Sequence, residues 1–129
     1  MLSGPADLIA AARRSRKMLG GGLRQAGVLA AAGIYALDHN IERLVHDHEH
    51  AAELAEGLAG LDGVDAVSCH TNMVFVATEK AGHPLELRLR DRGVLARAAQ
   101  SPIRLVTHLD VGAEEIEAAV RAFGDALTH

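Results

Sequence analysis

Apolar residues recur at helical spacing in the first half of the chain. The opening segment, with Ser3 as the expected N-cap, is predicted to be a helix that three glycines at 20–22 end. A second helix is expected from about Leu23 to Leu37; it is apolar nearly all round, which indicates burial on several sides. A third helix is amphipathic. Its expected buried face carries Ile41, Leu44, Val45, Ala52, Ala55 and Leu58.

After Gly63 the pattern changes to short runs rich in β-branched residues. The predicted order is strand, strand, helix, strand, strand, helix, over residues 64–69, 71–77, 85–92, 94–98, 103–106 and 114–127. This order predicts an α/β fold with a mixed or antiparallel sheet. We therefore expect a helical segment at residues 1–62 and a small α/β domain at residues 63–129.

Composition restricts the possible functions. The chain has 129 residues, of which 49% are hydrophobic, so one domain with a packed core is expected. Only Tyr35, Phe75 and Phe123 are aromatic and the net charge is -4, so we expect no nucleic-acid partner. The longest apolar run is too short for a membrane span, and the single Cys69 permits no internal disulfide. A soluble, cytoplasmic protein that does not bind membranes is the expectation.

The segment RRSRKMLGGGLRQAG, residues 13–27, is the first candidate for chemistry. Three glycines could leave backbone N–H groups open to an anion, and a helix that starts directly after them would add partial positive charge. Lys17 and Arg24 flank the glycines and could close on a phosphate or carboxylate. The alternative is a glycine helix break beside solvated arginines, which the spacing alone favours.

The second candidate is SPIRLVTHLD, residues 101–110. Positions 104, 106 and 108 share one face of a strand, so Arg104 and His108 could point together into a cleft. An arginine there suits bidentate capture of a carboxylate. The alternative, weighted equally, is an edge strand with exposed polar residues.

Three histidines, His46, His48 and His50, form a weaker candidate. His46 and His50 have the spacing of two metal ligands on a helix, but no further ligand motif is present, so no metal is predicted. We expect a polar helix face with His48 partly buried on the apolar stripe. Cys69 and His70 should point to opposite sides of a strand. Asn72 lies in an apolar stretch and should find a polar partner.

Three segments together resemble the C-terminal part of low-specificity L-threonine aldolases: RKMLGGGLRQAGVLAAAGIYAL, HTNMVFV and IRLVTHLDV. These enzymes belong to the β-eliminating lyase group of pyridoxal-phosphate enzymes with the aspartate-aminotransferase fold. The resemblance implies helices that bridge from a large domain, followed by a small C-terminal α/β domain. It also implies a lyase that cleaves L-threonine or L-allo-threonine to glycine and acetaldehyde with pyridoxal 5'-phosphate.

The resemblance also implies roles for single residues. Arg104 corresponds to the arginine that binds the α-carboxylate of the amino acid substrate, while Lys17 and Arg24 fall in the cofactor and substrate region, partly across a subunit boundary. The cofactor-carrying lysine of the family lies upstream, so no catalytic residue is assigned here. We expect an inactive fragment or one subunit of a split enzyme, which forms a homo-oligomer or associates with a missing N-terminal part. The alternative is a non-catalytic helical association module.

Overall fold

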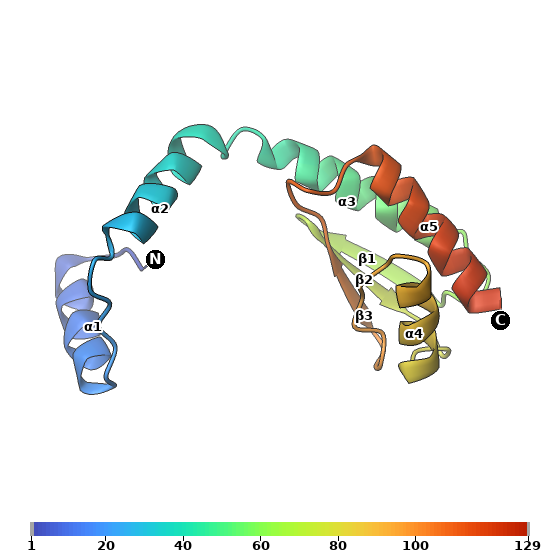
Figure 1. Cartoon of the computed structure of the whole chain (residues 1–129), viewed down its shortest axis with the longest axis horizontal. Helices are drawn as coiled ribbons and strands as arrows, with labels where there is room; N and C mark the ends of the chain where they lie inside the picture. The colour runs from blue at the N-terminus through green and yellow to red at the C-terminus, as the bar shows by residue number, and fades with distance from the viewer. Residues whose placement is uncertain (1, 129) are drawn as a thin grey trace. The chain divides into compact units, whose positions relative to one another are not determined.

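A computed structural model describes residues 2–128, which form five helices and three strands (Figure 1). The chain divides into two compact units, residues 1–41 and 42–129. We call them the N-terminal unit and the C-terminal unit. The division lies before the third helix, whereas the sequence suggested a boundary at residue 62. No helix among the described residues is long and apolar enough to span a membrane.

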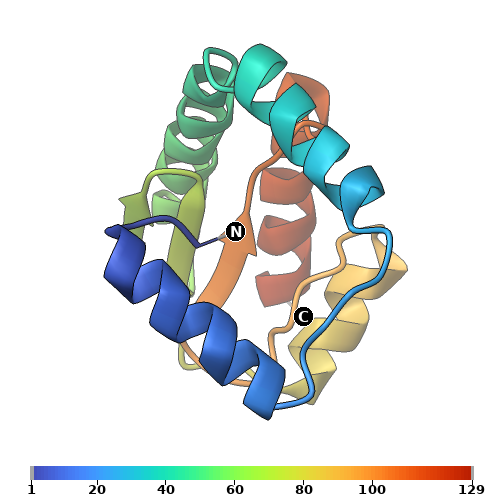
Figure 2. The same cartoon turned by 90° about the vertical axis from the view of Figure 1, so that its left-hand side faces the viewer.

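The N-terminal unit contains two helices, α1 (Ala6–Met18) and α2 (Gly27–His39), which an irregular loop joins (Figure 2). Pro5 stands at the N-cap of α1, so the expectation of Ser3 there is wrong. The second helix begins four residues later than expected because turns occupy residues 24–26. Neither helix has a buried residue. Val28 of α2 is 77% exposed. The N-terminal unit by itself therefore does not provide the burial of α2 on several sides that the sequence predicted.

The C-terminal unit contains the sheet and three helices. Its elements are α3 (Leu44–Ala59), β1 (Ala66–His70), β2 (Met73–Ala77), α4 (His83–Asp91), β3 (Ile103–Val106) and α5 (Ala113–Thr128). The strands lie in the order β1-β2-β3, and both pairs are antiparallel. This confirms the antiparallel form of the predicted sheet and leaves β3 at its edge.

Residues 94–98 are not a strand, so the prediction of a fourth strand there is wrong. Their backbone is bonded to α4 and the residue before it. The Glu86 carboxylate accepts the Ala98 N–H at 3.0 Å, and the Gly82 N–H donates to the Ala98 carbonyl at 2.7 Å. These bonds satisfy the N–H and the carbonyl of Ala98, which a strand would have paired with the sheet.

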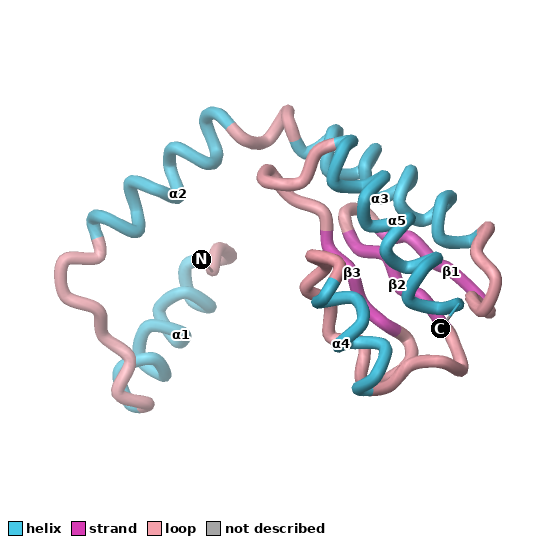
Figure 3. Tube along the Cα trace, turned by 45° about the vertical axis from the view of Figure 1, so that its right-hand side comes forward, coloured by secondary structure: helices cyan, strands magenta, loops and turns pink. Residues whose placement is uncertain are grey.

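One face of the sheet is covered by α3 and α5, which run side by side (Figure 3). The core between these layers is almost entirely aliphatic, with Phe123 as its fully buried aromatic residue. The two helices approach closely at Gly57, where a Cβ would lie 2.7 Å from the Cγ2 of Val120. The predicted apolar face of α5 is confirmed by the burial of Ile116, Phe123 and Leu127.

The buried face of α3 differs from the expected one. Asp47, Ala51, Leu54 and Leu58 are buried, whereas Leu44, Val45 and Ala52 are exposed. The helix turns a carboxylate inward because an arginine four residues earlier in the chain pairs with it. Both guanidinium nitrogens of Arg43 donate to Asp47, at 2.6 and 3.1 Å. Hydropathy alone cannot anticipate such a pairing.

The structure predicts a large difference between two identical truncations. Leu58 is fully buried between α3 and the sheet, whereas Leu95 is 86% exposed. Leu58→Ala should lower the free energy of unfolding by about 2–5 kcal/mol, because it leaves a cavity in a packed core. Leu95→Ala should change it by less than about 0.5 kcal/mol. Urea denaturation of both variants checks this, and equal losses would contradict the assignment of the core.

Candidate functional site

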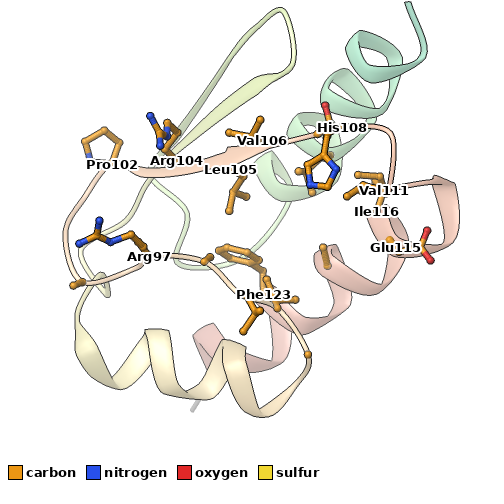
Figure 4. A pocket seen from close by; sticks show the side chains of 18 of the residues that line it. Arg97, Pro102, Arg104, Leu105, Val106, His108, Val111, Glu115, Ile116 and Phe123 are labelled. Carbon is orange, nitrogen blue, oxygen red and sulfur yellow. The ribbon is translucent and has the colours of Figure 1, made fainter. Parts of the chain in front are cut away.

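The candidate site is a cleft of about 880 Å³ in the C-terminal unit, beside β3. Its walls are β3, the irregular segment before that strand, and one side of α5. Arg97 and Arg104 lie at one end, and His108 and Glu115 lie at the other (Figure 4). The floor between the two ends is apolar and includes Phe123. A cleft with this lining suits a small ligand whose charged groups are few and fixed.

The alternation of β3 places Arg104 on the face of the strand away from the helices, at the rim of the cleft and not toward its apolar floor (Figure 4). Ile103 and Thr107 are buried on the helix side, while Arg104, Val106 and His108 are exposed. Both Arg104 and His108 are exposed, but β3 ends at Val106 and His108 lies beyond the strand, so a shared strand face stays a prediction. Four residues of extended chain span about 13 Å, so Arg104 and His108 contact different parts of the cleft rather than one shared group.

His108 is held in a tight turn. Its carbonyl accepts the Val111 N–H at 2.9 Å, and its Nδ1 accepts the Asp110 N–H at 3.3 Å. The same Nδ1 lies 3.7 Å from Oδ2 of Asp110. These contacts engage Nδ1 within the turn, so Nε2 is the ring nitrogen left for a ligand.

Buried polar groups lie directly behind this strand. The Asn72 side-chain amide donates to the Thr107 carbonyl at 2.8 Å, which confirms that Asn72 has a polar partner and identifies it. The Thr107 hydroxyl donates to the Asp47 carbonyl of α3 at 2.6 Å. Neither Thr107 nor Asp47 was among the candidate residues predicted from the sequence. The signal for Thr107 was its place in the 103, 105, 107 alternation, which directs a hydroxyl into the core.

The glycine segment ends α1, as the helix-break alternative that the spacing favours describes. Gly20 has a φ of +78°, and its N–H donates to the Lys17 carbonyl at 3.2 Å. The Gly21 N–H donates to the Arg16 carbonyl at 2.7 Å. These amides close the helix C-terminus, as in a glycine cap. The helix expected directly after the glycines starts only at Gly27, so that part of the prediction is wrong.

The structure places the remaining candidate cations in a different unit from the cleft. Lys17 and Arg24 are exposed residues of the N-terminal unit. Arg104 belongs to the C-terminal unit. The helix-break interpretation therefore describes the local structure around residues 20–22, with both cations accessible to a partner.

The histidines of α3 are arranged differently from the expectation. His48 is exposed, so the prediction that it is partly buried is wrong. The partly buried one is His50, whose Nδ1 has no hydrogen-bond partner among the described groups. Nδ1 of His46 lies 3.3 Å from Oε2 of Glu49. Within residues 2–128 no group of three or more His, Cys, Asp or Glu is placed to hold a metal ion.

Solved structures define the class of fold. An (S)-enantioselective omega-transaminase from Thermomicrobium roseum matches 67% of this chain with a TM-score of 0.59 and 21% identity. An ornithine aminotransferase from Plasmodium yoelii matches 67% with a TM-score of 0.52 and 16% identity. These matches cover 23% and 25% of the two enzymes, respectively. The fold is therefore that of a part of an aminotransferase-like enzyme.

Sequence comparisons narrow this class to one family. The model of the β-eliminating lyase family matches residues 1–81. The low specificity L-threonine aldolase of Escherichia coli K12 is 50% identical over 128 residues, which are 95% of this chain and 38% of that enzyme. Low-specificity L-threonine aldolase 1 of Arabidopsis thaliana is 36% identical over 98% of this chain and 37% of its own length. The chain belongs to the β-eliminating lyase family and resembles a C-terminal part of threonine aldolases.

The family implies use of pyridoxal phosphate, and the described residues do not form a complete site for it. Covalent attachment needs a lysine, and none lines the cleft. Lys80 donates to the Leu127 carbonyl at the end of α5, and Lys17 is exposed in the other unit. The amides of Gly20 and Gly21, which could have met a phosphate, are bonded within α1. A complete cofactor site therefore needs groups beyond these residues.

Proposed function

We propose that this chain is the substrate-carboxylate-binding part of a pyridoxal-phosphate-dependent lyase, which cleaves L-threonine or L-allo-threonine to glycine and acetaldehyde. The 50% identity to the Escherichia coli aldolase over 95% of the chain supports the reaction. The observation that carries the role of this chain is Arg104 at one end of the cleft.

Arg104 has the chemistry that this role needs. Its side chain lies on the exposed face of an edge strand, and within the described residues it makes no ion pair. A guanidinium presents two parallel N–H donors to a carboxylate, which fixes orientation as well as position. The backbone beneath it is paired with β2 in the sheet, so the position from which the arginine extends is fixed before the substrate arrives.

The remaining chemistry requires groups outside the described site. In such enzymes the bound pyridoxal group supplies an electron sink for the negative charge left at Cα. Lys17 and Arg24 supply exposed cations that suit the phosphate and substrate region once a partner surface covers them. The chain spans 38% of the Escherichia coli relative. We therefore propose that the isolated chain is inactive and works in a larger assembly.

A chimaera tests this proposal. In it, residues of this chain replace the matching segment of the Escherichia coli aldolase, with which they share 50% identity. The chimaera should cleave L-threonine. Arg104→Ala should lower kcat/KM by about 100-fold, because a charge-assisted bidentate bond contributes about 2–3 kcal/mol. Arg104→Lys keeps the charge but loses the two parallel N–H donors. Its kcat/KM should therefore lie between those of the unsubstituted chimaera and of Arg104→Ala.

Arg121→Ala is the matched control for the chimaera. Arg121 is an exposed arginine of α5 that lies 3.4 Å from Glu117 and does not line the cleft. Its removal should change kcat/KM by less than about twofold, because exposed ion pairs contribute little. Equal effects of Arg104→Ala and Arg121→Ala would refute the carboxylate role.

The second candidate function, a helical association module, is favoured by the N-terminal unit. Its helices bury no residue, and an apolar groove lies between them. Among the exposed apolar side chains of α2 are Val28 and Tyr35. Soluble proteins rarely expose such a surface unless another chain or segment covers it. We propose that it contacts a second copy of this chain or the rest of the enzyme in the cytoplasm.

Sedimentation velocity tests this association. The purified chain should sediment as an oligomer at micromolar concentration. Val28→Glu should weaken the association by about tenfold or more, because a charge replaces a buried contact worth over 1 kcal/mol. Leu95→Glu is the control, since Leu95 is an apolar residue of the C-terminal unit that is 86% exposed, compared with 77% for Val28. A monomer at all concentrations would rule out self-association.

A further inference from the structure

Three groups from separate elements meet behind the cleft, and the proposed mechanism does not use them. They are Asn72 in the turn between β1 and β2, Thr107 directly after β3, and the Asp47 carbonyl in α3. We call this set the Thr107 lock. Thr107 is 1% exposed and Asp47 is 4% exposed, so the hydrogen bond between them is shielded from water.

The lock extends the sheet by one residue. The ladder between β2 and β3 ends at Met73 and Val106, and the next pair in the same register is Asn72 and Thr107. The Thr107 N–H donates to the Asn72 carbonyl at 3.0 Å. The Asn72 side-chain amide donates to the Thr107 carbonyl at 2.8 Å. The Asn72 side-chain amide thus makes the bond to the Thr107 carbonyl that a backbone N–H would make in a regular ladder.

The turn that presents Asn72 is strained. Thr71 has a φ of +54°, which a β-branched residue rarely adopts. Such a conformation costs about 1–3 kcal/mol and persists only where the surroundings impose it. Here the two bonds between Asn72 and Thr107 hold the turn against the end of β3.

The lock also joins the sheet to the helix layer. The Thr107 hydroxyl donates to the Asp47 carbonyl at 2.6 Å, and the Asp47 carboxylate is itself held by Arg43. Thr107 precedes His108 directly and follows Arg104 by three residues. We infer that Thr107 and Asn72 are positioning residues that fix the backbone from which Arg104 and His108 reach the cleft. As a role in substrate binding, this inference rests on the proposed function.

Thr107→Val tests the lock in the full-length chain by NMR. It removes the hydroxyl and keeps the shape, whereas Thr107→Ser keeps the hydroxyl. Thr107→Val should shift the signals of the His108 ring and the Arg104 side chain, and should raise amide exchange at residues 106–108 by about three- to tenfold. Thr107→Ser should restore the wild-type pattern. Asn72→Asp, which cannot donate to the Thr107 carbonyl when ionised, should reproduce the effect of Thr107→Val.

Leu58→Ala is the control for general loss of stability. It should leave the Arg104 and His108 signals in place, since Leu58 lies outside the lock. The inference would be overturned if Thr107→Val and Leu58→Ala gave the same local pattern, or if Thr107→Ser failed to restore it.

The same substitutions in the chimaera separate this inference from the proposed function. Thr107→Val should raise the KM for L-threonine by about three- to tenfold with a smaller change in kcat, and Thr107→Ser should restore it. If Arg104→Ala does not change kcat/KM in the chimaera, the proposed carboxylate role is refuted. The NMR comparison of Thr107→Val and Thr107→Ser still tests whether the lock positions Arg104 and His108. If Arg104→Ala lowers kcat/KM but Thr107→Val leaves the KM for L-threonine unchanged, the role of the lock in substrate binding is refuted.

Discussion

The hydrogen bond from the Thr107 hydroxyl to the Asp47 carbonyl connects the two layers of the C-terminal unit at the end of β3. On one side of it lies α3, whose inward carboxylate is neutralised by Arg43. On the other side lies β3, the strand that holds Arg104 at the rim of the cleft. Because a buried hydroxyl without a partner is costly, this bond restricts how α3 can sit on the sheet. The geometry of the cleft depends on that restriction.

The two units differ in how far their own residues can stabilise them. The C-terminal unit has an aliphatic core around Phe123, with α3 and α5 in close contact at Gly57. At the end of α5, Arg88 donates to the Ala126 carbonyl and Lys80 to the Leu127 carbonyl, which satisfies groups that a helix terminus leaves open. The N-terminal unit buries none of its helical residues. This contrast fits a chain that spans 38% of its Escherichia coli relative and is proposed to work in a larger assembly.

Much of the fold followed from local patterns. The strand at residues 103–106 and the apolar face of α5 were predicted because alternation and helical spacing are both strong there. The strand at 94–98 was wrong because the Glu86 carboxylate and the Gly82 N–H bind the Ala98 backbone, and no local pattern reveals such partners. The buried face of α3 was displaced because Arg43, four residues earlier in the chain, pairs with the Asp47 carboxylate, and a pattern of hydrophobic positions does not include such an ion pair. Arg104 was identifiable from its motif, whereas Thr107 became visible only through its contacts.

The most direct test of the account is a crystal structure of the chimaera with glycine, the proposed product, bound at its active site. The account predicts that the Arg104 guanidinium donates two hydrogen bonds of about 2.7–2.9 Å to the glycine carboxylate, with the Thr107 hydroxyl still on the Asp47 carbonyl. A glycine carboxylate held by other residues, with Arg104 directed to solvent, would contradict it.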